Sequence, residues 1–340
     1  MRSTIPAPES VTGAGDLDVA VVLVTYNSAD VIERCLRAIP AALGGLRRTR
    51  VIVVDNASAD GTPGLVRELA PWVVVHESGG NLGYAAAINL GTGLVDPRAG
   101  VMVLNPDTVP GPGSIERLAR WAAGHPDAGV VVPRIEDEDG RLYPSLRREP
   151  TVLRALGEAV AGGHRSGRVA AFGEVILAED RYVTGARADW ATGAALFVTR
   201  RAADAVGPWS EDFFLYSEET DYALRVGDAG LAVTYVADSV VVHRGGDMRR
   251  SPRLWSLQVV NRIRLYDRRH GRAASALFWC AVALNESLRS VRSPIHRAAL
   301  RALLTRRARP VPGRQSTGLP LSSKTFDDAH SRPGPPETTP

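Results

Sequence analysis

The first half of the chain alternates short apolar runs with segments of helical periodicity. Four of the runs lack the apolar–polar alternation of a half-exposed strand, which is typical of parallel strands covered on both faces. They are residues 19–24, 51–54, 73–76 and 101–104. Strands that alternate with helices form βαβ units, so the pattern predicts an α/β fold, a mostly parallel sheet flanked by helices.

The segment after the first run has the clearest helical pattern. Four apolar residues between positions 32 and 39 follow the i, i+3, i+4, i+7 spacing of one buried helix face. Asn27 or Ser28 is expected to cap this helix, and Pro40 is expected to end it.

The second half is less regular. A helix is expected at residues 114–123, and another begins near Glu218. Strands are expected at residues 130–132, 190–198, 233–236 and 240–243. Residues 135–189 have no clear periodicity and are expected to be irregular, whereas residues 254–304 are expected to be helical.

These patterns predict four parts along the chain. Residues 1–17 and 310–340 are rich in Pro, Ser, Thr and Gly and are expected to be disordered. Residues 18–250 would form the catalytic domain and residues 251–309 a basic helical extension. Residues 1–16 lack the apolar core of a signal peptide. The longest apolar stretch, residues 273–284, is roughly half of the ~20 residues that a membrane span needs.

The composition changes this picture mainly at the C-terminal end. The chain has 340 residues, 44% of them hydrophobic, and a net charge of +4. Twelve Arg but only two acids lie between Arg262 and Arg309. Two interpretations stay open: these helices lie on an anionic membrane surface, or they pack on the catalytic domain with Arg facing water. The two cysteines, Cys35 and Cys280, are far apart and indicate no disulfide framework.

Polar residues follow four of the predicted strands, where parallel strands end at a common edge. Ligands of open α/β sheets bind in the crevice outside the carboxyl ends of the strands. Asp55 could accept a hydrogen bond from a pyrimidine N3–H, and Gly83 allows a close backbone approach. The nucleotide-binding candidates are Thr25, Asn27, Asp55, Asn81, Gly83 and Asn105. Taken alone, each also fits a helix cap or a turn.

Asp107 follows the fourth apolar run and is a candidate metal ligand. Hard cations such as Mg²⁺ take oxygen ligands, commonly one or two carboxylates together with the substrate's phosphates. His243, at the end of a late strand, could add a nitrogen ligand, which would favour Mn²⁺. The alternatives are a turn for Asp107 and a structural residue for His243.

An acidic cluster follows an aromatic stretch. Glu218, Glu219 and Asp221 come directly after residues 213–216, three of which are aromatic. The aromatic residues indicate a partly buried helix start, where the helix dipole stabilises carboxylates and one of them could act as a general base. A solvated helix face, with Asp221 paired to Arg225, is the alternative.

The ordered set of motifs resembles inverting glycosyltransferases of family 2, which have the nucleotide-sugar-binding GT-A fold. The resemblance covers residues 19–245 and is carried by 22-VLVTYN-27, 54-VDNAS-58, 81-NLGYA-85, 105-NPD-107, 192-TGA-194, the Glu218–Asp221 cluster and His243. More narrowly, segments near residues 111–115, 139–145 and after 243 resemble actinobacterial rhamnosyltransferases of cell-wall linker synthesis, which use dTDP-rhamnose and polyprenyl-diphosphate-linked GlcNAc.

The resemblance implies a role for each matching residue. Asp55 would read the pyrimidine, Asp107 would bind the metal, and Asn105 stands at the first position of the family's Asp-x-Asp motif. Glu219 aligns with the catalytic base, which is usually Asp in a Glu-Asp pair. The extra methylene leaves Glu218 and Glu219 both as candidates. Trp190, Gly193 and Asp221 are expected in the sugar or acceptor pocket, where Trp190 could equally be a core residue.

The function that follows is transfer of a sugar, with L-rhamnose from dTDP-rhamnose as the leading donor, to a lipid-linked or cell-envelope glycan. A second donor class, such as UDP-galactofuranose, and a non-catalytic sugar-nucleotide-binding protein are the alternatives. A nucleotidyltransferase would show a Gly-rich triphosphate loop after the first strand, which is missing from the sequence. No nucleic-acid recognition motif is present. The expected location is the cytoplasm, with peripheral contact to the inner face of the membrane left open.

Overall fold

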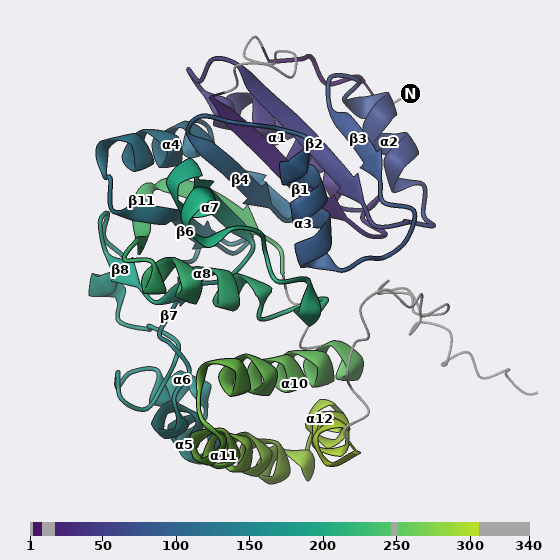
Figure 1. Ribbon diagram of the computed structural model, residues 1–340. Coiled ribbons are helices and arrows are strands. Elements are labelled where there is room, and N and C mark those ends of the chain that lie inside the picture. The colour runs from purple at the N-terminus through teal and green to yellow at the C-terminus, as the bar shows by residue number, and fades with distance from the viewer. Residues whose placement is uncertain (1–2, 9–17, 246–250, 306–340) are drawn as a thin grey trace, which may run out of the picture.

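The computed structural model describes residues 3–8, 18–245 and 251–305, and its centre is one twisted sheet (Figure 1). The strand order is β3-β2-β1-β4-β10-β6-β11-β5, with β8 paired to β11. Six strands run in one direction, while β10, β5 and β8 oppose them. The strands are β1 (Val19–Thr25), β2 (Thr49–Asp55), β3 (Val74–Glu77), β4 (Gly100–Leu104), β5 (Thr108–Pro110), β6 (Ala128–Glu136), β8 (Arg187–Ala188), β10 (Ala195–Thr199) and β11 (Ala232–His243).

Helices cover both faces of this sheet, which explains why the central strands are apolar throughout. One core cluster packs one face under α1 (Ile32–Leu43), α2 (Thr62–Leu69) and α4 (Ser114–Gly124). The other face packs under α3 (Tyr84–Gly93), α7 (Arg200–Val206) and α8 (Glu218–Asp228). The predicted α/β fold with a mostly parallel, helix-flanked sheet is confirmed.

Several boundaries differ from the sequence predictions. Pro40 lies inside α1 instead of ending it, because the helix continues to bury Ala42 and Leu43 against the sheet. The α1 N-cap is Val31, with no side-chain cap. The two strands expected near the end of the catalytic part are one strand, β11, with a register shift between Val236 and Val240.

The N-terminal residues also differ from expectation. Residues 3–8 belong to the sheet body, where Ile5 is buried and its N–H donates to the Leu69 carbonyl at 2.6 Å. Residues 1–2 and 9–17 of the segment predicted to be disordered, and all of residues 310–340, lie outside the described residues.

The region expected to be irregular contains a helix, α5 (Val152–Ala161), capped by the Thr151 hydroxyl. Its buried residues, Ala155 and Ala159, are small, and its partner helix lies more than a hundred residues later in the chain. No local pattern could reveal that partner. The short elements around it are α6 (Gly163–Ser166), η1 (Glu179–Arg181), η2 (Glu211–Phe213) and a small two-stranded sheet of β7 (Leu146–Arg147) and β9 (Trp190–Ala191).

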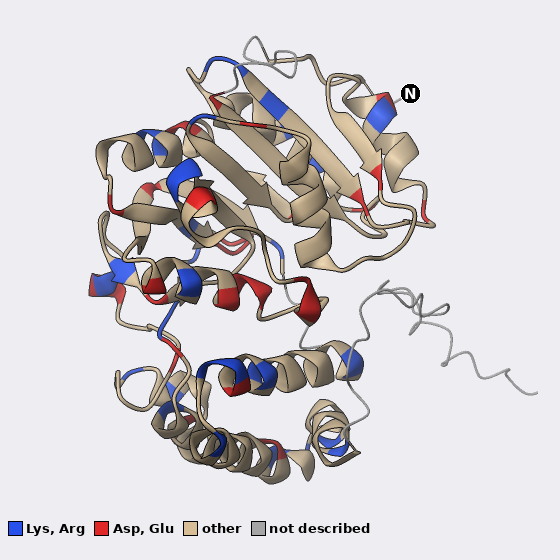
Figure 2. Ribbon diagram, viewed as in Figure 1, with Lys and Arg blue, Asp and Glu red and all other residues tan. Residues whose placement is uncertain are grey.

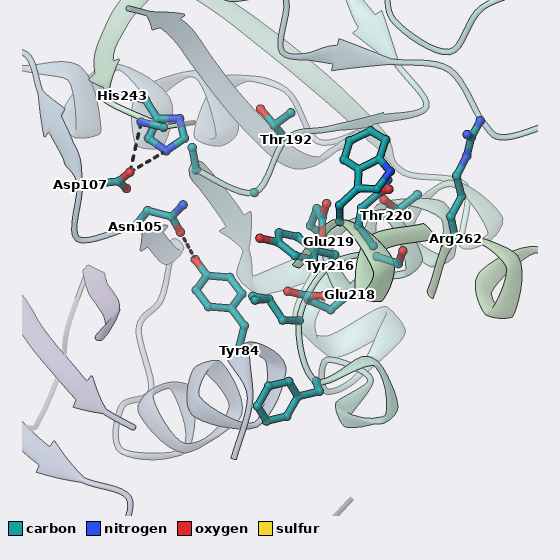
Figure 3. A pocket seen from close by; sticks show the side chains of 18 of the residues that line it. Tyr84, Asn105, Asp107, Thr192, Tyr216, Glu218, Glu219, Thr220, His243 and Arg262 are labelled. Carbon is teal, nitrogen blue, oxygen red and sulfur yellow. Dashed lines mark hydrogen bonds and ion pairs between the residues drawn. The ribbon is translucent and has the colours of Figure 1, made fainter. Parts of the chain in front are cut away.

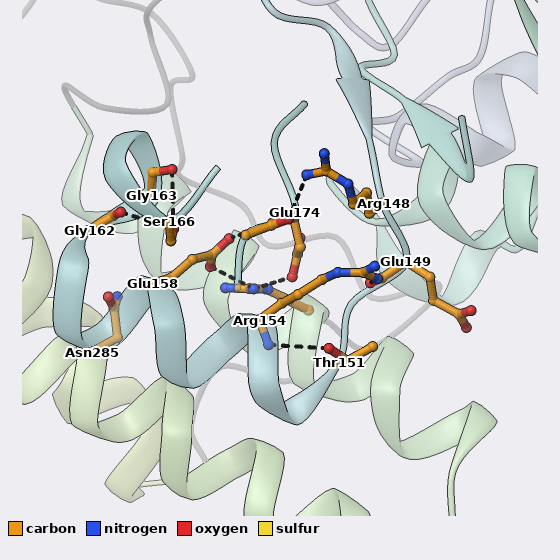
Figure 4. A network of polar contacts seen from close by, with 12 residues as sticks. Arg148, Glu149, Thr151, Arg154, Glu158, Gly162, Gly163, Ser166, Glu174 and Asn285 are labelled. Carbon is orange, nitrogen blue, oxygen red and sulfur yellow. Dashed lines mark hydrogen bonds and ion pairs between the residues drawn. The ribbon is translucent and has the colours of Figure 1, made fainter. Parts of the chain in front are cut away.

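The predicted C-terminal helical extension is confirmed as three helices: α10 (Pro252–Arg269), α11 (Arg272–Ser290) and α12 (Pro294–Thr305). They form a separate core together with α5, below the sheet body in Figure 1. Within this unit, Arg262 of α10 forms ion pairs with Glu158 of α5, at 2.8 Å, and with Glu174, and both acids are labelled in Figure 4. In the described part of the chain, no helix has the length and hydropathy required to cross a membrane.

Helix α10 is buried on two faces and therefore joins the two cores. Val259 and Ile263 face the helical core, whereas Leu265 packs against Phe213 and Leu224 of the sheet body. Several α10 arginines reach the same body, since Arg268 pairs with Asp212 and Arg269 with Asp228. Arg268 stays exposed to solvent and Arg269 is half-buried, so both ion pairs lie at the surface between α10 and the sheet body.

Candidate functional site

The carboxyl ends of β1, β2 and β4 lie side by side and deliver three of the predicted polar groups to one edge. Parallel pairing aligns Thr25 with Asp55, and Leu23 with Leu104, the residue before Asn105. The Asp55 carboxylate is buried and accepts hydrogen bonds from Thr25 Oγ1 at 2.7 Å and from the Ser58 N–H at 2.8 Å. Its position is therefore fixed by the backbone of β1 and β2.

The loops after β1 and β2 are tied together by Asn27. Its backbone is left-handed, with φ of 50°, and its Oδ1 accepts a hydrogen bond from the Ala59 N–H at 2.8 Å. The Asn27 N–H donates to Ser58 Oγ at 2.8 Å. Together these contacts make a rigid polar corner at the edge of the sheet.

Gly83 permits a close contact between the loop before α3 and the loop before α8. Its φ is 92°, and a Cβ there would lie 2.5 Å from the Phe214 carbonyl oxygen. The next N–H, that of Tyr84, donates to the same carbonyl at 2.7 Å. Asn81 Oδ1 accepts from the Gly83 N–H at 3.2 Å, which orients this loop.

Asp107 and His243 meet across paired strands. Antiparallel pairing of β5 and β11 places His243 opposite Thr108, and His243 Nε2 lies 3.2 Å from Asp107 Oδ2 (Figure 3). Burial tends to raise the pKa of Asp107, but the contact with His243 and the Gly245 N–H outweighs burial and lowers it. Asp107 is therefore held as a carboxylate.

Asp107 and His243 are the residues of this site that could hold a metal ion. Among the residues that the structure describes, no group of three or more His, Cys, Asp or Glu side chains could enclose an ion. Asp107 and His243 can supply two ligands, one oxygen and one nitrogen, on the cavity wall. Two protein ligands suit a Mg²⁺ or Mn²⁺ ion whose remaining ligands come from a substrate diphosphate and water.

Tyr84 lies between the Asp107–His243 pair and the carboxyl groups of Glu218 and Glu219. Its hydroxyl donates to Asn105 Oδ1 at 2.7 Å, while its ring lies on the side of Glu218 in Figure 3. Burial and the nearby charges of Glu218, Glu219 and Asp107 raise its pKa well above the ordinary value. Tyr84 is thus a neutral hydrogen-bond donor between the acidic groups.

Glu218 and Glu219 occupy the first turn of α8 and are held away from water. Burial, and then the charge of Glu219, raises the pKa of Glu218 well above the ordinary value. Glu218 Oε2 has no hydrogen-bond partner among the described residues, which also suits the protonated form. Burial also raises the pKa of Glu219, to about 7. Hydrogen bonds from backbone N–H groups at the start of the helix lower this pKa, but burial outweighs them.

The Glu219 side chain lies over Gly193 and near Arg147. A Cβ on Gly193 would be 3.4 Å from Glu219 Cβ and Cγ, so this glycine leaves room for the carboxylate. The charge of Arg147 lowers the Glu219 pKa, and its guanidinium lies 5.8 Å from the Trp190 ring centroid. Trp190 is half-buried, and its Nε1 donates to the Arg148 carbonyl.

A single cavity of about 1460 Å³ connects the edge of the sheet with the helical extension. Predicted site residues that line it are Asn27, Asn81, Gly83, Asn105, Asp107, Trp190, Gly193, Glu218, Glu219 and His243. Thr25 and Asp55 are buried behind this lining. Asp221 does not line it, because its carboxylate is paired with Arg225 at 2.9 Å.

Comparison with known proteins decides the family. The family model described as "Glycosyl transferase family 2" matches residues 20–173. The N-acetylglucosaminyl-diphospho-decaprenol L-rhamnosyltransferase of Mycobacterium tuberculosis is 34% identical over 301 residues, which are 83% of this chain and 96% of the relative. This chain belongs to glycosyl transferase family 2. It is therefore a glycosyltransferase, and its sheet, flanking helices and C-terminal extension confirm the predicted GT-A fold.

Solved glycosyltransferase structures are more distant from this enzyme. The mannosyltransferase PcManGT from Pyrobaculum calidifontis, in complex with GDP-Man and Mn²⁺, is 19% identical, with 90% of this chain and 83% of that chain covered and a TM-score of 0.49. S. aureus TarS 1-349, in complex with UDP-GlcNAc, is 14% identical, with 86% and 82% covered and a TM-score of 0.49.

The turn before the acidic pair of this glycosyltransferase is strained. Phe214, Tyr216 and Ser217 all have positive φ, at 65°, 68° and 77°, a conformation that costs of order 1–3 kcal/mol per residue and persists only where the surroundings enforce it. Asn261 of α10 holds the turn in this conformation. Its buried Nδ2 donates to the carbonyls of Phe213, Leu215 and Tyr216, at 2.7, 2.9 and 3.2 Å.

Three residues at this site were not found from the sequence. Asn261 lies outside the family motifs, and its one visible sign is a polar residue in an apolar helix pattern. Arg147 lies in the segment expected to be irregular, so no sign was available. Tyr84 belongs to a quoted motif, but its contact with Asn105 depends on how α3 packs on β1 and β2.

Replacing Asn261 by Leu should damage the turn before Glu218 without disturbing the polar corner at the edge of the sheet. Three buried carbonyls would lose their donor, so we expect a loss of about 1–3 kcal/mol in the free energy of unfolding. Because the turn positions Glu219, kcat should fall by about tenfold or more, with donor KM little changed. Urea unfolding, steady-state kinetics and the pH profile of kcat measure these effects.

Ser256→Ala is the matched control on the same helix, because the Ser256 hydroxyl donates only within α10. A shifted pH profile in Asn261→Leu would identify a positioning effect on Glu219. Unchanged kcat and an unchanged pH profile, despite lowered stability, would show that Asn261 is merely structural.

Proposed function

We propose that this glycosyltransferase moves a sugar from a nucleotide-diphosphate donor to a hydroxyl of a lipid-linked acceptor, with inversion at the anomeric carbon. The observation that carries the proposal is the placement of Asp107–His243 and of Glu218–Glu219 on the walls of the same cavity. A cation-binding carboxylate at one position and a carboxyl with a pKa of about 7 at another are the two groups that such a transfer requires.

The donor nucleotide would occupy the corner formed by Asn27, Asp55 and Asn81. The Asp55 carboxylate keeps acceptor capacity beyond its contacts with Thr25 and Ser58, which suits a pyrimidine N3–H. The sugar would lie toward Gly193 and Trp190. Thr192 Oγ1 lines the cavity, is buried and has no partner among the described residues, so it is available to a sugar hydroxyl.

Asp107 and His243 would hold Mg²⁺ or Mn²⁺ against the donor diphosphate. When bound, the cation would neutralise negative charge that develops on the departing nucleotide. Asn105 carries no charge and is engaged by the Tyr84 hydroxyl, so Asp107 is the main anionic ligand. The nitrogen ligand from His243 favours Mn²⁺.

Glu219 is the proposed general base. A carboxyl with a pKa of about 7 is largely ionised just above neutrality and still basic enough to take a proton from an attacking hydroxyl. Glu218, with its higher pKa and unpartnered oxygen, would stay protonated. A single displacement from the face opposite the nucleotide inverts the configuration.

The leading substrates are dTDP-L-rhamnose and a GlcNAc-diphospho-polyprenol. They are supported by the mycobacterial relative, whose name states rhamnosyl transfer to N-acetylglucosaminyl-diphospho-decaprenol and which matches 83% of this chain. Such an acceptor is membrane-embedded, so we propose a cytoplasmic enzyme in peripheral contact with the inner face of the membrane. Other donors, including UDP-galactofuranose, are compatible with the same pyrimidine corner.

The base assignment predicts opposite behaviour of two neighbouring variants. Glu219→Gln should lower turnover by about 10²–10⁴ while retaining donor binding. Glu218→Gln should stay within about tenfold of wild type, because Gln resembles a protonated Glu. In the wild type, kcat/KM should rise with pH through about 7, since only the ionised Glu219 accepts a proton. Rates measured from pH 5.5 to 9 test this, and a reversed order of the two variants would transfer the role to Glu218.

The donor and metal roles predict a ligand-dependent gain in thermal stability. With Mn²⁺ and donor at about 100 times Kd, the melting temperature should rise on the order of 5 °C. Asp107→Ala should lose the Mn²⁺-dependent part of this rise. Asp238→Ala, which removes an exposed acid from β11, is the control. An undiminished rise in Asp107→Ala would contradict the metal role, and comparison of dTDP- and UDP-sugars identifies the donor.

A further inference from the structure

Helix α11 carries its apolar side outward. Between Arg272 and Arg292 its exposed residues are uncharged and recur on one face: Ala273, Ala276, Leu277, Cys280, Leu284, Ser287, Leu288 and Val291. Leu277, Leu288 and Val291 are 60%, 57% and 80% exposed. A helix on a water-facing surface normally shows the reverse pattern, with charged residues outside.

The charged residues of α11 that follow Arg272 are Glu286 and Arg289, and both point inward. Glu286 is buried and accepts hydrogen bonds from Trp255 Nε1, at 3.0 Å, and from His296 Nδ1 when that nitrogen carries a proton, at 2.7 Å. Arg289 donates to the carbonyls of Glu158 and Ala159 on α5. The orientation of the helix is therefore fixed by polar contacts on its inner side.

Helix α5 extends the same surface. It packs beside α11 at the end of the molecule remote from β3 (Figure 1), and its exposed residues Leu153, Leu156 and Val160 also lie on one face. Val160 is 80% exposed. We call the outward sides of α5 and α11 the apolar face. An apolar surface of this extent on two adjacent helices indicates an interaction site.

Exposed basic residues lie at the ends of α11 and on segments that pack beside α5 or α11. The exposed charged side chains of residues 151–173 and 272–305 include Arg165, Arg168, Arg272, Arg292, Arg297 and Arg301. The two acids of these segments, Glu158 and Glu286, are turned inward. In Figure 2 most of α11 is tan, the colour of residues other than Lys, Arg, Asp and Glu.

We propose that the apolar face of α5 and α11 rests on the surface of an anionic lipid bilayer. Apolar side chains flanked by Arg match the acyl boundary and the negative headgroups of such a surface. A second copy of the chain fits less well, because a twofold contact would bring the same Arg rims together. Residues 306–340 also fit less well, since Val311, Leu319, Leu321 and Phe326 are their only large apolar residues.

This membrane surface adds to the proposed function and rests on it for the identity of the lipid-linked acceptor. The inner sides of the same helices line the cavity, through Glu158 of α5 and through Val282 and Asn285 of α11. A bilayer under α5 and α11 would therefore lie next to the cavity end farthest from Asp107. An acceptor anchored by its lipid could present its sugar to Glu219 from that side.

A native cysteine allows a direct test. Cys280 is exposed in the middle of the apolar face, whereas Cys35 is buried, and burial raises the Cys35 pKa to about 12. An environment-sensitive fluorophore can therefore be attached selectively to Cys280 of the full chain. We expect a blue shift on addition of phosphatidylcholine vesicles that contain phosphatidylglycerol, and a smaller shift with phosphatidylcholine alone. No shift with either vesicle would overturn the proposal.

Unlabelled variants test the face in vesicle co-sedimentation. The double variant Leu284→Glu/Leu288→Glu should bind anionic vesicles at least about tenfold more weakly, because it places two charges in the apolar contact. Leu94→Glu, at an exposed leucine after α3, is the matched control and should bind as the wild type does. Equal vesicle binding by the double variant and the control would overturn the proposal.

Activity on two acceptors separates this proposal from the proposed function. The double variant should transfer sugar at the wild-type rate to a short-chain, water-soluble GlcNAc-diphosphate acceptor and lose transfer to the same headgroup on a polyprenyl chain in vesicles. Loss on both acceptors would count against a membrane role for the face. Vesicle binding by a wild type that transfers to neither acceptor would leave the membrane surface supported and contradict the substrate assignment instead.

Discussion

The burial of two adjacent carboxyl groups at the start of α8 is the constraint on which the rest of the site depends. A buried ionised carboxylate is costly, so the protein neutralises one group and raises the pKa of the other to about 7. Both carboxyl groups lie on the cavity wall, so the residues packed beside them limit their contact with water. These residues are Gly193, Tyr84 and the turn from Phe213 to Ser217. Each of them depends on a backbone conformation or a contact that other parts of the chain determine.

The helical extension is therefore part of the site and not an appendage to it. Asn261 satisfies three carbonyls of a turn with three left-handed residues, and Leu265 closes the small core formed with Phe213 and Leu224. The same helix contributes Val259 to the core of the extension. A displacement of α10 would disturb both the acidic pair and the helical core, because one face of α10 packs on the sheet body and another on the helical core.

How far the sequence predicts this arrangement depends on how local each feature is. The sheet and its polar edge were predictable, since strand periodicity and parallel pairing bring Asn27, Asp55 and Asp107 to one side. Pro40 was misjudged because burial of the residues after it outweighs its local preference for ending a helix. Helix α5 and Asn261 could not be predicted, because their partners lie far away in the chain and follow no repeat.

The same distinction separates the two ends of the cavity. Its sheet end is built from short motifs whose hydrogen bonds lie within β1, β2, the loops after β1, β2 and β4, and the start of α3. Its other end is built by side chains of α5, α10, α11 and α12, which meet only through tertiary packing. The two ends therefore differ in how they depend on the sequence: the sheet end depends on short motifs, whereas the other end depends on contacts between helices far apart in the chain. Asn261 links the two, because it lies on a helix of the second end and holds the turn before the acidic pair.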